Sequence, residues 1–87
     1  MHANLVPIIF IYKMYFMNQV LINKQPVELY KILKFEGIRS SGAEAKNTIA
    51  EGLVKLNGEI ETRRRKQIVD GDVIECDGVT YQVLLEG

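Results

Sequence analysis

A short helix with a marked start and a marked end, followed closely by a tight turn, limits the folds open to this chain. Ser41 and Glu44 have the spacing of a capping box, in which each side chain bonds the backbone amide of the other residue. Gly52 favours a left-handed backbone, so we predict a helix over residues 41–51. Asn57–Gly58 then has the composition of a primed hairpin turn, which requires an antiparallel strand on each side.

Local signals on both sides of this segment extend the pattern to an α+β domain. Val20 to Ile22 predicts a strand, and apolar residues at helical spacing predict a first helix over residues 26–36. Pro26 is expected at the first position of that helix, and Gly37 is expected as its C-terminal cap. A second hairpin turn is predicted near the C-terminus, at Asp77–Gly78. We therefore expect an α+β fold in which two short helices pack on a small sheet of hairpins.

The composition excludes several classes of protein. A chain of 87 residues, 47% hydrophobic and 25% charged, is one globular domain. Its single cysteine, Cys76, cannot form an intramolecular disulfide, and its single histidine, His2, leaves no zinc cluster to build. No nucleophile–base pair and no glycine-rich phosphate loop can be assembled. We therefore predict no catalytic residue, no metal site and no cofactor, and we expect Cys76 to be a small core residue.

The first sixteen residues differ from the rest of the chain. They hold four of the seven aromatic residues and one charge, Lys13, and they are too short and too interrupted for a membrane span. Two interpretations stay open: an additional strand, or an upstream extension that precedes a native start at Met14 or Met17. The predicted division is an apolar extension over residues 1–16 and one domain over residues 17–87.

Charge is balanced overall but unevenly distributed. Eleven basic residues offset eleven acidic ones, yet residues 34–66 hold eight basic and five acidic groups, while residues 67–87 hold five acidic and no basic groups. We expect the acidic third to face away from an anionic partner. The neighbours of Lys46 at helical spacing include Gly42, Ala43 and Ala50, whose small size leaves it open to a phosphate. A solvated lysine without a ligand is the alternative.

The order of these residues resembles the alpha-L RNA-binding motif, a family named after the fourth protein of the small ribosomal subunit. The matching residues of the second helix and first hairpin are Ser41, Gly42, Ala43, Glu44, Ala45, Lys46, Ile49, Gly52, Val54, Leu56, Asn57 and Gly58. The first helix matches at Leu29, Ile32 and Leu33, and the closing segment matches at Gly71, Asp72, Val73 and Ile74. The resemblance covers about residues 17–85. It is strongest to small stand-alone bacterial members of the YbcJ type, which share Thr62, Arg63, Arg64 and Lys66.

This resemblance implies that the two helices meet in an L and present a basic surface, continued by the first hairpin, to structured RNA. The contacting residues it implies are Lys34, Arg39, Ser41, Lys46, Lys55, Asn57, Arg63, Arg64, Arg65 and Lys66. Gly42 departs from the family pattern, because many members carry arginine directly after the serine cap. At this position the backbone amides of the helix N-terminus are left as the anion-binding element.

The expected function is therefore that of a non-catalytic RNA-binding protein. Its expected partner is ribosomal or transfer RNA, and the ribosome is a further expected partner. Neither a membrane nor a small-molecule substrate is expected. The lone cysteine and the missing targeting signals favour the cytoplasm. The alternative is a protein-interaction adapter without RNA affinity, in which the basic run only aids solubility.

The aromatic residues help to distinguish modes of RNA binding. Beyond residue 16 these are Tyr30, Phe35 and Tyr81, all of which we expect in the core or at its edge. Readers of single-stranded RNA stack bases on exposed aromatic side chains. The sequence therefore favours recognition of a folded RNA through the shape of its backbone.

Overall fold

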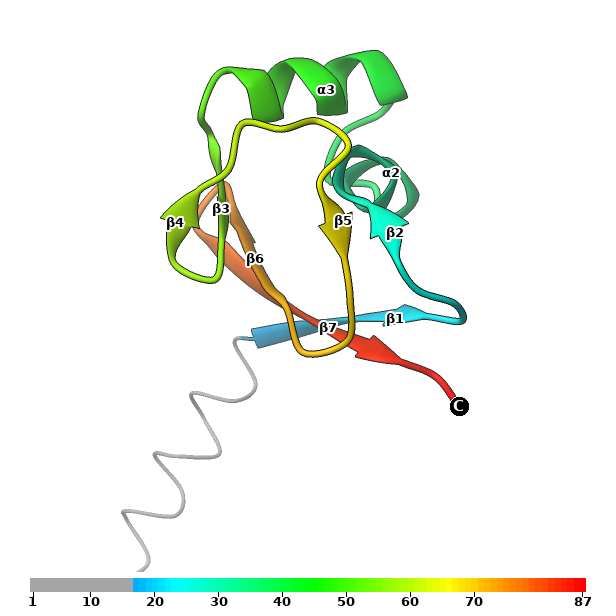
Figure 1. The fold of residues 1–87 in the computed structure, drawn as a ribbon. Coiled ribbons are helices and arrows are strands. Elements are labelled where there is room, and N and C mark those ends of the chain that lie inside the picture. Colours follow the sequence, from blue (N-terminus) through cyan, green and yellow to red (C-terminus); the bar gives the residue numbers. More distant parts are fainter. Residues whose placement is uncertain (1–16) are drawn as a thin grey trace, which may run out of the picture.

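The computed structural model describes residues 17–87, which form one mixed sheet, a short two-stranded ribbon and two helices (Figure 1). The two interpretations of residues 1–16 lie outside the described part of the chain. The main sheet has the strand order β1-β7-β6-β3-β4, and β2 and β5 form the ribbon. In chain order the elements are β1 (Met17–Ile22), β2 (Val27–Glu28), α2 (Leu29–Phe35), α3 (Gly42–Ala50), β3 (Val54–Leu56), β4 (Glu59–Ile60), β5 (Gln67–Ile68), β6 (Val73–Cys76) and β7 (Val79–Leu85).

The main sheet contains more than the predicted hairpins. Strands β3, β4, β6 and β7 pair antiparallel, but β1 runs parallel to β7, with Val20 opposite Val83. This pairing joins the first and last strands of the domain, so the helices and the other strands form the connection between them. A parallel neighbour requires a long crossover, and no local sequence signal specifies it.

The first helix begins later than predicted. Val27 and Glu28 pair with Ile68 and Gln67 of β5, so the chain stays extended until Leu29 and Pro26 lies outside the helix. The C-terminal end confirms the prediction, because Gly37 has a φ of 72°. The amide of Ile38 donates to the carbonyl of Leu33 at 2.9 Å, and the amide of Gly37 donates to the carbonyl of Lys34 at 3.1 Å. These two bonds define a Schellman motif.

Helix α3 lies at the predicted place, but only half of the capping box forms among the described residues. The amide of Glu44 donates to the Ser41 hydroxyl at 3.1 Å, whereas the carboxylate of Glu44 accepts from the Ser40 hydroxyl. Gly52, at a φ of 78°, ends the helix as predicted. In Figure 1, α2 is seen nearly end-on while α3 runs across the view, so the two helices meet at a steep angle.

The core lies between the helices and the main sheet. Both predicted hairpin turns form, with positive φ values of 52° at Asn57 and 56° at Asp77. Cys76 is buried in the core as predicted, and burial raises the pKa of its thiol. The largest fully buried side chains are those of Leu29, Leu33, Ile49, Ile68, Ile74, Val20, Val54 and Val83.

Candidate nucleic-acid interface

The basic run Arg63–Lys66 is held against the start of α2 by its own backbone. The residue before the helix, Glu28, provides no side-chain cap for the first amides of α2. Instead the amide of Leu29 donates to the carbonyl of Lys66 at 2.9 Å, and the amide of Tyr30 donates to the carbonyl of Arg64 at 3.1 Å. Two of the four amides that a helix start leaves without a partner are thereby satisfied. The run is therefore a loop fixed beside α2.

Tyr30 of α2 brings cations from two other elements together. The Nζ atom of Lys46, on α3, lies 4.5 Å from the centroid of the Tyr30 ring. The guanidinium carbon of Arg65, in the loop, lies 5.2 Å from the same centroid. Both distances are within the range of a cation–π interaction, which holds a cation against the ring without neutralising its charge. Lys46, which has glycine and alanine among its neighbours at helical spacing, is therefore oriented by an aromatic ring.

The N-terminus of α3 lies close to the same ring. A Cβ atom at Gly42 would lie 3.7 Å from Cε2 of Tyr30 and 4.0 Å from Cδ of Lys34. Lys34 follows Tyr30 by one helical turn, so their side chains share a face of α2. The structure thus gathers cations from α2, α3 and the loop around Tyr30. We call this group the basic patch: Lys34, Lys46 and Arg65. Arg64 adjoins it through its backbone carbonyl, which accepts from the amide of Tyr30.

One carboxylate lies beside the basic patch and orients part of it. Glu28 bonds Nζ of Lys31 at 3.1 Å through Oε1, and Nη1 of Arg65 at 3.1 Å through Oε2. The hydrogen bond from Lys31, and then that from Arg65, lowers the pKa of Glu28, so this carboxylate is ionised at neutral pH. The Arg65 side chain remains 61% exposed. Its guanidinium therefore has further donors available to a phosphate.

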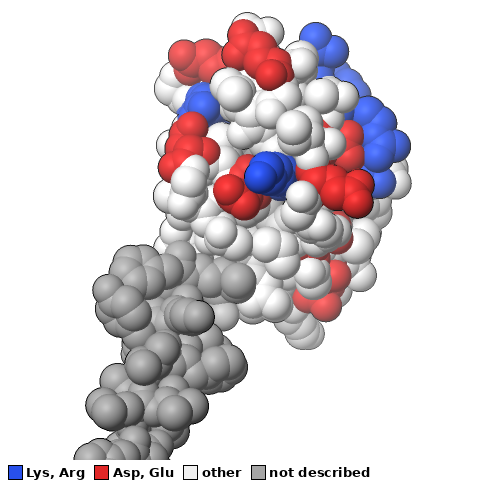
Figure 2. Space-filling model, turned by 90° about the vertical axis from the view of Figure 1, so that its left-hand side faces the viewer, with Lys and Arg blue, Asp and Glu red and all other residues white. Residues whose placement is uncertain are grey.

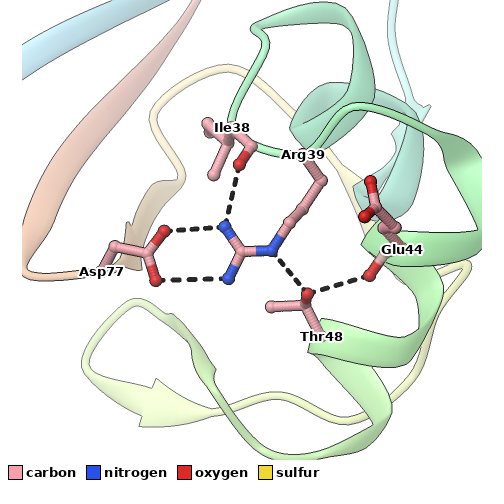
Figure 3. Close-up of polar contacts among 5 residues, drawn as sticks. All are labelled: Ile38, Arg39, Glu44, Thr48 and Asp77. Atoms are coloured by element: carbon pink, nitrogen blue, oxygen red, sulfur yellow. Dashed lines mark hydrogen bonds and ion pairs between the residues drawn. The ribbon is translucent and has the colours of Figure 1, made fainter.

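Arg39, which the resemblance assigns to the RNA surface, is bonded to the protein on all sides (Figure 3). Its Nε donates to Thr48 of α3 at 2.7 Å and its Nη1 donates to the carbonyl of Ile38 at 2.8 Å. The same guanidinium forms a bidentate ion pair with Asp77, at 2.7 and 3.2 Å. The hydrogen bond from Arg39 lowers the pKa of Asp77. Arg39 therefore fastens the connection between the helices to the β6–β7 turn, and we place it outside the basic patch.

Two more predicted contacts also serve the fold. Ser41 caps α3 through its hydroxyl. The side chain of Asn57 donates to Asp72 at 3.0 Å and accepts from the amide of Val73 at 2.8 Å, which fixes the β3–β4 turn against β6. In both cases the polar group already has a protein partner.

The predicted contacts Lys55 and Arg63 also lie apart from the basic patch. Lys55 stands between two buried residues of β3 and so points to the sheet face opposite the core, with Glu75 as its neighbour on β6. Arg63 donates three hydrogen bonds to Glu61, at 2.9, 2.9 and 3.0 Å. The side-chain bonds of this pair lower the pKa of Glu61 from 4.5 to about 2. Lys66, like Arg64, bonds α2 through its backbone carbonyl and is not counted in the basic patch.

The acidic C-terminal third contacts two of the residues that the resemblance assigns to the RNA surface. Asp77 pairs with Arg39, and Asp72 bonds Asn57. Figure 2 shows acidic and basic side chains interleaved over one face of the molecule, with several lysine and arginine side chains gathered at one of its edges. On this face, positive charge is therefore concentrated at one edge.

Two further features concern residues 17–87 as a whole. Within this range no three histidine, cysteine, aspartate or glutamate side chains lie together in a way that could hold a metal ion. The helices found there are too short or too polar to cross a membrane.

The fold places this chain in a known protein family. The family model described as the S4 domain matches residues 20–84, so the chain belongs to the S4 domain family and has its alpha-L RNA-binding domain. The predicted family and the α+β fold class are both confirmed. Members of this family are generally non-catalytic.

Two members of known families are similar to this chain over most of its length. The chain is 48% identical over 64 residues to the putative RNA-binding protein YbcJ of Escherichia coli (strain K12), which covers 72% of this chain and 91% of the relative. The solution structure of E. coli YbcJ, described as having an alpha-L motif involved in RNA binding, matches with a TM-score of 0.62 and 46% identity, over 78% of this chain and 87% of that one. The probable ribosome maturation protein RlbA of Bacillus subtilis (strain 168) is 32% identical over 68 residues, 77% of this chain and 96% of RlbA.

Proposed function

We propose that this chain is a non-catalytic protein that binds structured RNA, ribosomal or transfer RNA, through the basic patch. The observation that carries the proposal is the convergence of Lys46 and Arg65 on the ring of Tyr30. Phosphate contacts supply most of the affinity of proteins for nucleic acids. Cations that are ordered before binding lose less conformational entropy when they meet the phosphates.

The arrangement favours a folded RNA over a flexible strand. The three cations of the basic patch come from a helix, a second helix and a loop whose backbone is fixed, so their relative positions are set by the fold. A rigid set of cations suits an RNA whose phosphates are also held at fixed spacings, and proteins read such RNA by shape. The name of the relative RlbA, which refers to ribosome maturation, supports ribosomal RNA and the ribosome as partners. We further propose that residues 17–87 are the binding unit and that it acts in the cytoplasm.

The test compares two lysines of the same protein. Binding of the full chain to fluorescently labelled transfer RNA, and to a ribosomal RNA fragment, is measured by fluorescence anisotropy. We expect Lys46→Glu to weaken binding several-fold, because it places a negative charge beside Tyr30 while glutamate remains a good helix former. The matched control is Lys55→Glu, on the opposite face of the sheet, which leaves the affinity unchanged. Equal affinity of Lys46→Glu and wild type would contradict the proposal.

A further inference from the structure

A second surface adjoins the basic patch. It is a groove of about 510 Å³ between β1 and α2, a volume in the range of small-molecule sites. Its apolar lining includes Leu21, Val27, Ile32 and Phe35. Leu21 is 55% exposed and Phe35 is 68% exposed, so the prediction that Phe35 lies in the core or at its edge was wrong. The cause is local: Phe35 is the last residue of α2, at the border between its buried and solvated faces.

The groove is continuous with the basic patch. Lys31 and Glu28 line the groove, and Glu28 also bonds Arg65 of the basic patch, so one carboxylate joins the two surfaces. Lys34 belongs to the basic patch, and its Nζ lies 5.7 Å from the centroid of the Phe35 ring. A ligand that extends along the basic patch would therefore meet an exposed aromatic ring with a cation beside it.

We propose that the groove holds an unpaired nucleotide of the RNA that the basic patch binds, with its base stacked on Phe35. Lys31 and Lys34 lie where they can meet the phosphates next to that nucleotide. The groove is also lined by Glu36 and Glu86, whose carboxylates can accept hydrogen bonds from the amino group of a base. This inference rests on the proposed function and adds a specific RNA feature to it: a bulged or terminal base beside a paired region.

The experiment uses two RNA hairpins that differ by one unpaired adenosine, and the full-length protein. We expect wild type to bind the bulged hairpin more tightly than the paired one, by roughly 5-fold or more, as base stacking on an aromatic side chain contributes in other proteins. Phe35→Leu should lose this preference and keep its affinity for the paired hairpin. Phe35→Tyr is the matched control, since it retains the ring and should retain the preference. All three proteins should melt at similar temperatures because the ring is exposed.

A fluorescent base at the bulge gives a second measurement. We expect the emission of 2-aminopurine at the unpaired position to change on binding of wild type and Phe35→Tyr, and to change much less with Phe35→Leu. If wild type binds both hairpins equally, or if Phe35→Leu keeps the preference, the inference is overturned while the proposed function stands. If wild type binds neither hairpin, both fail. A Phe35→Leu variant that alters only self-association or binding to a protein would assign the groove to a protein partner and likewise overturn the inference.

Discussion

Replacing Tyr30 tests whether an aromatic ring prepares the basic patch for RNA. Tyr30→Leu removes the ring that lies 4.5 Å from Lys46 and 5.2 Å from Arg65, and it retains an apolar side chain of similar reach. A cation–π contact at a partly exposed site contributes about 0.5–1 kcal/mol, so two contacts correspond to roughly 1–2 kcal/mol. If that energy is what orders the two cations before binding, RNA affinity should fall about 5- to 30-fold. Tyr30→Phe keeps the ring and should bind like wild type.

The assay separates loss of order from loss of charge. Anisotropy titrations with labelled transfer RNA give the affinity of wild type, Tyr30→Phe and Tyr30→Leu, and thermal melts confirm that each is folded. Because Tyr30→Leu retains every cation, the slope of log affinity against log salt should match that of wild type while the whole line is displaced. Wild-type affinity for Tyr30→Leu would show that the ring does not order the two cations for binding. An equal loss for Tyr30→Phe would show the same.

Three further predictions concern single substitutions. Arg64 has no ion pair among residues 17–87, whereas Arg63 is bonded to Glu61. Arg64→Ala should therefore lower RNA affinity in anisotropy titrations more than Arg63→Ala does. An equal loss for the two variants would contradict this prediction. The Glu61 carboxylate, its pKa lowered from 4.5 to about 2, stabilises the fold above pH 4.5, and that contribution is lost as the pH falls toward 2. Urea unfolding of Glu61→Gln should therefore depend less on pH in this window, and an unchanged dependence would refute the assignment. Gly42→Ala should stabilise by about 0.4–1 kcal/mol in the same assay, because the helical backbone accepts alanine and the new Cβ makes ordinary contacts; destabilisation would show that the added methyl group is not accommodated.

The parts of this fold that depend on neighbouring residues could be predicted from the sequence. The Ser41 cap, the ends of both helices at Gly37 and Gly52, and the turns at Asn57 and Asp77 all follow from side-chain or backbone preferences over a few residues. The start of the first helix could not be predicted, because the pairing of β2 with β5 decides it. Val27 pairs with Ile68, far along the chain, and such a distant strand partner leaves no local signal.

In the candidate site, too, the sequence indicates residue types but not the tertiary contacts that they make. The resemblance identified the cations, but it could not separate those around Tyr30 from those that hold the fold together. Arg39 meets Asp77 across 38 positions, and Arg65 meets Tyr30 across 35. Both contacts depend on the tertiary fold. Phe35 was misplaced for a different, local reason: it is the last residue of α2, at the border between the buried and solvated faces, where helical spacing does not decide exposure.

The salt dependence of RNA binding measures how many phosphates the basic patch contacts. The full chain is titrated into labelled transfer RNA and a ribosomal RNA fragment over a range of salt concentrations. If the basic patch binds phosphates, the plot of log affinity against log salt should be linear, with a slope that corresponds to roughly three to six contacts at somewhat under one unit each. Substitution of Lys46 by glutamate should lower that slope by about one unit. A flat response, or no binding at any salt concentration, would contradict RNA recognition through the basic patch.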